Sequence, residues 1–155
     1  MKAEDKRLAE AALKQMFVGR HLYGIHFFPH SPILRLEDTT NPASDRTTHL
    51  TIEAQWLACE DELPGNSAAD MKFAKHTVEE LAQIACSLRE HSITSATLED
   101  NVPHLRLRFD DGRLMLIDGH HDQFECWQAS MGDFLIVAIP GDNVALWVPE
   151  DFHAA

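Results

Sequence analysis

The histidines and carboxylates of this chain gather most densely at Asp118-Gly119-His120-His121-Asp122. A zinc ion needs about four converging nitrogen, oxygen or sulfur ligands, and a turn this polar offers three, with His26 and His30 as outside ligands. Against this, the adjacent His120 and His121 point to opposite sides of an extended chain. No HExxH or paired CxxC motif accompanies them. The pattern favours a solvated turn, so we predict no metal or other cofactor.

Asp110, Asp111 and Glu125 are scattered acids of the kind that hold Mg²⁺ in metal-dependent nucleases. However, Asp111 followed by Gly112 is explained as a hairpin turn, and Glu125 lacks the lysine that such sites often carry two residues later. The sequence also has no nucleophile elbow and no glycine-rich phosphate loop. Cys59 follows an apolar run and is expected to be an inert core thiol. We therefore predict that the protein is not an enzyme.

Charge is distributed unevenly along the chain. The net charge is -12, but residues 1–20 hold five basic and three acidic residues, a local +2, which leaves -14 for the remainder. No lysine or arginine follows Arg113, whereas seven acids do. Such a surface repels nucleic acid and anionic membrane and attracts a basic protein. Plain solubility is the alternative explanation.

Length and composition indicate one globular domain, residues 1–155. No apolar run approaches the ~20 residues needed to cross a membrane, and the acid-containing N-terminal stretch does not resemble a signal peptide. Three widely spaced cysteines fit neither a disulfide framework nor a metal knuckle. We expect a cytoplasmic protein.

The elements that must position the polar residues are two helices and a series of strands. Residues 3–17 carry a helical apolar stripe, and residues 77–89 begin with the capping box Thr77-x-x-Glu80. A further short helix is expected at 68–74, and one strand at 49–59. The closing stretch reads as a hairpin, with 134–139 apolar throughout and so predicted to be a central strand buried on both faces. The expected fold is α+β, with antiparallel sheet and two main helices.

A short internal similarity suggests a repeat. Pro32-Ile33-Leu34-Arg35-Leu36 resembles Pro103-His104-Leu105-Arg106-Leu107, and each follows a helix and a strand by pattern. This predicts two αβββ halves, residues 3–60 and 77–149, that share one core. Chance similarity is the alternative.

Two motifs of the second half carry a family resemblance. Phe124-Glu125-Cys126-Trp127 resembles a Tyr-Glu-Ala-Trp signature, with Phe124 in place of the tyrosine. The stretch 139–147 resembles Pro-Gly-Gly-(Asp/Glu)-x-Ala-Val-Trp. Together, residues 93–149 are similar to a family of small β-rich bacterial proteins often encoded near polymorphic toxin and contact-dependent growth inhibition systems. The resemblance implies an immunity protein that binds and neutralises a toxin domain, and it supplies no catalytic residues.

Acidic loops at 60–62, 110–111 and 118–125 are the expected binding sites for a basic, nuclease-like toxin domain, because loops at strand ends can vary without disturbing the core. We expect Phe124 or His121 to lie at the centre of an acidic rim. The alternatives are a small-ligand or metal-binding domain without catalytic activity, and a structural subunit of a larger assembly. The candidate partner-binding residues are Glu60, Asp61, Glu62, Asp110, Asp111, Asp118, His121, Asp122, Phe124 and Glu125.

Overall fold

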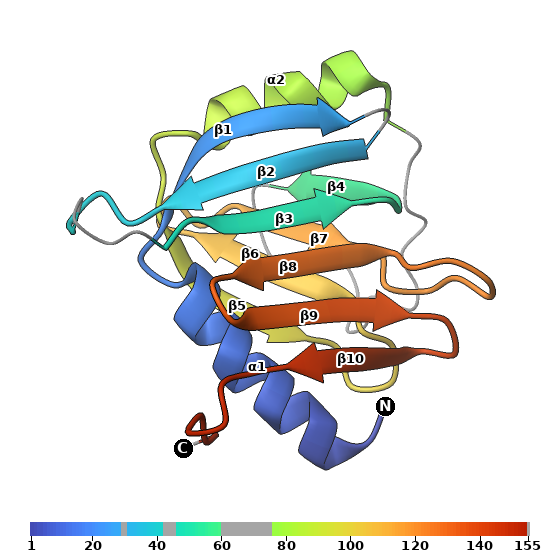
Figure 1. Ribbon diagram of the computed structural model, residues 1–155. Helices are drawn as coiled ribbons and strands as arrows, with labels where there is room; N and C mark the ends of the chain where they lie inside the picture. The colour runs from blue at the N-terminus through green and yellow to red at the C-terminus, as the bar shows by residue number, and fades with distance from the viewer. Residues whose placement is uncertain (29–30, 42–45, 60–75, 155) are drawn as a thin grey trace.

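Two antiparallel sheets and two helices make up the protein, as a computed structural model shows for residues 1–28, 31–41, 46–59 and 76–154 (Figure 1). The predicted α+β class is confirmed. The short helix expected at 68–74 lies outside the described residues. Within the described residues, no helix is both long and apolar enough to cross a membrane.

The strands divide between a six-stranded and a four-stranded sheet. The larger sheet has the order β1 (His21–Phe28), β2 (Ser31–Glu37), β3 (Thr48–Ile52), β8 (Trp127–Met131), β9 (Phe134–Ile139) and β10 (Asn143–Trp147). The smaller sheet has the order β4 (Trp56–Cys59), β7 (Leu114–Ile117), β6 (Leu105–Phe109) and β5 (Ile93–Leu98). Figure 1 shows the smaller sheet behind the larger one.

The core lies between the two sheets. Alternate residues of β3, β6 and β8 are buried, so that Leu50 and Ile52 of β3 and Trp127 of β8 join Leu105 and Leu107 of β6 in one buried cluster. All five are at most 1% exposed. Strand alternation thus supplies one apolar face per sheet, and the two faces bury each other.

The helices lie at the open sides of the sheet pair. Helix α1 (Ala3–Phe17) contacts β5 and β10, the edge strands on one side, and buries Leu13, Met16 and Phe17 completely. Helix α2 (Val78–Leu88) contacts β1 on the other side (Figure 1). The predicted N-cap is confirmed, because the Thr77 hydroxyl accepts a hydrogen bond from the Glu80 N–H at 3.2 Å. The Glu80 carboxylate bonds to His76 Nδ1, at 2.9 Å.

The closing hairpin differs from its prediction in one respect. Strands β9 and β10 pair as expected, but β10 is the edge of the sheet and β9 is next to it, so β9 is not central. Leu135 and Ile139 are half-buried, and Trp147 is 55% exposed. The prediction of two buried faces therefore fails at both ends of β9, whereas Val137 in its middle is only 5% exposed.

The expected strand at 49–59 is two strands in different sheets. Ile52 of β3 pairs with Trp127 in the larger sheet, whereas Trp56 of β4 pairs with Ile117 in the smaller one. Residues 53–55 carry the chain between the sheets. The apolar alternation in the sequence could not reveal this break, because each strand keeps its own inward face.

Each half of the chain contains a helix followed by a three-stranded antiparallel meander. In the first half β1, β2 and β3 are neighbours, and in the second β5, β6 and β7 are. The two similar segments lie in or just before β2 and β6, the middle strands of the meanders. A repeat origin and a single domain over 1–155 stay predictions.

Candidate binding surface

The antiparallel topology sorts the loops to two ends of the sheet pair. Strand β7 begins at Leu114 and ends at Ile117, so the 110–111 turn precedes it at one end and the 118–125 loop follows it at the other. A four-residue strand separates them by roughly 13 Å. The structure therefore divides the predicted binding residues into two groups. Glu60, Asp61 and Glu62 lie outside the described residues.

In the 110–111 turn, both carboxylates are bonded within the protein. Asp110 lies 2.7 Å from His91 Nδ1 through one oxygen and accepts from the N–H and hydroxyl of Ser92, at 3.2 and 3.1 Å, through the other. Arg113 donates its N–H and its Nε to Asp111, at 3.0 and 2.6 Å. The hydrogen bond with His91 is the main cause that holds the pKa of Asp110 below its ordinary value. Burial acts to raise the pKa of Asp111, but the bonds from Arg113 outweigh it and lower that pKa.

His91, Asp110 and Asp111 are also the one trio of the described residues whose ligand atoms all lie within 4.8 Å of one another. The two ring nitrogens of His91 face different carboxylates: Nδ1 lies 2.7 Å from Asp110, and Nε2 lies 3.5 Å from Asp111. Those carboxylates already accept hydrogen bonds from Ser92 and Arg113. The geometry is that of a hydrogen-bonded turn rather than of an open coordination shell. The His120-His121 turn forms no such trio with described residues.

The base of the 118–125 loop is fixed by its neighbours. The Asp118 N–H donates to the Gln55 carbonyl at 2.9 Å, and the Gly119 N–H donates to His104 Nδ1 at 2.9 Å. His104 is only 5% exposed. Position 119 requires glycine, because a Cβ there would lie 2.1 Å from the Pro103 carbonyl oxygen. The loop therefore leaves the sheet at a set position.

The tip of this loop presents an aromatic pair. The rings of His121 and Phe124 are 5.1 Å apart, and Phe124 is 66% exposed. His121 Nδ1 accepts from the backbone N–H groups of Gln123 and Phe124, at 3.0 and 3.1 Å, so the neutral ring carries its proton on Nε2. The loop itself holds the exposed Phe124 ring against His121. This reduces the conformational entropy that the loop loses when a partner binds.

A hollow of about 420 Å³ lies beside the aromatic pair. Among the residues that the structure describes, its lining includes three carboxylates and no lysine or arginine. Four predicted residues, Asp118, His121, Phe124 and Glu125, meet here, and Asp122 belongs to the same loop. Sequence reasoning missed Glu53 and Gln55, which reach the hollow because the chain crosses between sheets at 53–55. The lining residues are Glu53, Ala54, Gln55, Asp118, His120, His121, Phe124, Glu125 and Cys126.

Several groups around the hollow have altered acidity. The hydrogen bond between His120 Nδ1 and Asp142, at 2.6 Å, raises the pKa of His120. Burial acts to raise the pKa of Asp118, but its contacts with His104 and the His120 N–H lower it overall. Burial raises the pKa of Cys126 to about 12. The thiol therefore stays protonated near neutral pH, whereas the Asp118 carboxylate stays charged.

Searches of protein-family models, curated proteins and solved structures found no match to this chain. The resemblance to immunity proteins therefore rests on the two sequence motifs alone.

Proposed function

We propose that the protein is an immunity protein, which binds and neutralises a basic toxin domain through the 118–125 loop and its hollow. The observation that supports this is the His121–Phe124 pair, held by the loop's own backbone beside a hollow that contains Glu53, Asp118 and Glu125. An exposed aromatic ring within a rim of like charges is the arrangement that a basic protein surface complements.

The two kinds of residue have different roles in this proposal. Phe124 contributes affinity, because an aromatic ring that becomes fully buried at an interface is a frequent hot spot. Asp122, whose side chain is 90% exposed, and Glu125 speed association, because they attract a basic partner over a distance. Salt weakens this attraction, since the screening length falls to ~8 Å at physiological ionic strength.

The 110–111 turn is not part of the proposed surface. Its carboxylates bond to His91, Ser92 and Arg113, and a partner would have to replace these bonds to use them. We also propose that the protein has no catalytic activity of its own. Cys126 is the only cysteine among the described residues that line the hollow, and its protonated thiol is a poor nucleophile.

Binding of the toxin domain encoded next to this gene tests the proposal. Phe124→Ser should weaken the complex by about 2 kcal/mol, roughly thirtyfold in Kd, because it removes the central ring. Trp147→Ser is the matched control, since Trp147 is 55% exposed on the edge strand β10. Biolayer interferometry with both variants measures the difference.

Two results contradict the proposal. If purified toxin domains from neighbouring genes do not bind the wild-type protein, the immunity function is wrong. If they bind and Trp147→Ser weakens the complex as much as Phe124→Ser does, the function stands but the 118–125 loop is not the binding surface.

A further inference from the structure

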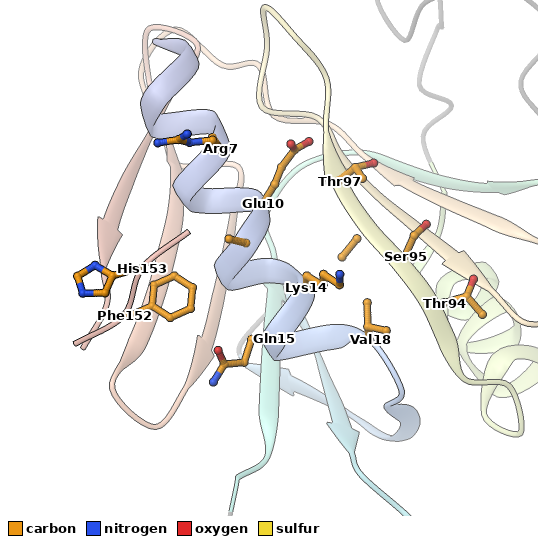
Figure 2. A pocket seen from close by; sticks show the side chains of 12 residues that line it. Arg7, Glu10, Lys14, Gln15, Val18, Thr94, Ser95, Thr97, Phe152 and His153 are labelled. Carbon is orange, nitrogen blue, oxygen red and sulfur yellow. The ribbon is translucent and has the colours of Figure 1, made fainter. Parts of the chain in front are cut away.

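A second hollow, of about 860 Å³, lies over helix α1 on another part of the molecule. Its floor is the outer face of the helix, with strand β5 on one side and the C-terminal residues Phe152 and His153 on the other (Figure 2). We call it the α1 groove. From the helix and its C-cap, the residues that line it are Arg7, Glu10, Ala11, Lys14, Gln15 and Val18.

The α1 groove holds cations that have no acidic partner among the described residues. Arg7 and Lys14 are exposed and form no ion pair with any residue that the structure describes. Glu10, the one acid among the described lining residues, is already engaged: it accepts from the Leu98 N–H at 2.9 Å and lies 3.8 Å from Lys6 Nζ. Although the chain has a net charge of -12, this groove is a local site that attracts a negatively charged ligand.

Strand β5 adds hydrogen-bonding groups along one wall. Thr94, Ser95 and Thr97 line the groove, and the Thr94 hydroxyl already donates to the Arg108 carbonyl at 3.3 Å. The Leu98 N–H points away from β6, because it donates to Glu10 on α1. In an antiparallel strand the backbone groups two residues earlier point the same way. The N–H and C=O of Ala96 therefore also face the α1 side.

The spacing of the cations limits what fits. Arg7 and Lys14 are two helical turns apart, about 10 Å along the axis, and the small side chain of Ala11 lies between them. Val18, which is 37% exposed, and Phe152 add apolar surface. The complementary ligand is a short peptide segment with two carboxylates about 10 Å apart and an apolar side chain. A nucleic acid would bring many phosphates toward a chain whose remainder carries -14.

We propose that the α1 groove binds an acidic segment of a partner protein, whose carboxylates pair with Arg7 and Lys14. The acidic partner for this groove is opposite in charge to the basic partner proposed for the 118–125 loop, so the two proposals are independent. The protein would then join a basic and an acidic partner on separate faces.

Selection from a library of random peptides of about twelve residues, displayed on phage against the folded full-length protein, tests this inference. Enriched peptides should include a class with two acids separated by two or three residues. Arg7→Gln with Lys14→Gln should weaken the binding of that class about fivefold, because two exposed ion pairs are lost. The matched control is Lys2→Gln with Arg89→Gln, which removes the same charge from exposed cations outside the lining.

Three results overturn the inference. The first is a peptide selection that goes against the groove. Either the enriched peptides lack paired acids, or Lys2→Gln with Arg89→Gln weakens their binding as much as Arg7→Gln with Lys14→Gln does. The second is tighter binding of a single-stranded DNA of similar length that depends on Arg7 and Lys14. The third is self-association in sedimentation that the groove variant abolishes, because a second copy would then be the occupant. Enriched peptides rich in lysine and arginine would bind the acidic 118–125 loop and not the α1 groove. The same selection therefore distinguishes failure of this inference from failure of the proposed function.

Discussion

The two acidic turns that flank strand β7 carry similar charge but differ in what the charge does. In the 110–111 turn, His91, Ser92 and Arg113 already bond to the carboxylates. In the 118–125 loop, Asp122 and Glu125 are exposed next to the aromatic ring of Phe124. A count of acids treats the two alike. A carboxylate is available to a partner only when the protein's own donors have not already bonded to it.

The largest effect is expected at Gly119, which anchors the loop that we propose for binding. Gly119→Ala should destabilise the protein by about 1–3 kcal/mol and abolish measurable toxin binding, because the new Cβ meets the Pro103 carbonyl oxygen and displaces the loop. Gly24→Ala is the control, since no atom beyond its two chain neighbours lies within 4 Å of its added Cβ. Thermal melts and binding assays of both variants give the answer. Normal binding by Gly119→Ala would show that the loop position does not matter.

A smaller effect is expected when equal charge is removed from the two turns. Asp122→Asn with Glu125→Gln should slow toxin association several-fold at low salt and leave folding intact, because both side chains are exposed. Asp110→Asn with Asp111→Asn removes the same charge and should leave the association rate nearly unchanged. Stopped-flow mixing across a salt series separates them. Equal slowing by both pairs would mean that net charge alone steers the toxin.

The smallest effect concerns acid stability of the 110–111 turn. The pKa of Asp110 is lower in the folded protein than its ordinary 3.8, so its ionised form contributes stability above that value and loses it as pH falls through the folded pKa. The Asp110→Asn variant should therefore have a lower melting temperature than the wild type at pH 7. The difference in melting temperature should narrow as the pH drops below 4. A gap that stays constant with pH would show that charge on Asp110 does not stabilise the turn.

Local signals predicted local structure well. Thr77 caps α2 as its motif indicated, and the turns at Gly112 and Gly141 adopt the positive φ that glycine permits. The division into two sheets was not predictable in this way. It depends on the pairing of Ile52 with Trp127 and of Trp56 with Ile117, and these partners are far apart in the sequence.

The candidate site shows the same limit. Asp118, His121, Phe124 and Glu125 share one polar segment, and that segment could be identified as an exposed loop from its composition. Glu53 has no sequence signal that links it to them, since the link is made by the crossing between sheets. The 110–111 turn lies at the opposite end of β7 from the 118–125 loop, and this separation follows only from the direction of that strand.

The pairing of β3 with β8 also bears on how the chain folds as it is synthesised. Leu50 and Ile52 of β3 leave the ribosome long before Ala129 and Trp127, the β8 residues with which they pair. The larger sheet therefore cannot close until most of the chain has been made, and its N-terminal meander keeps an unpaired apolar edge during translation. Such non-local pairing slows folding and exposes nascent chains to aggregation. We expect the newborn N-terminal half to depend on chaperones until β8 emerges.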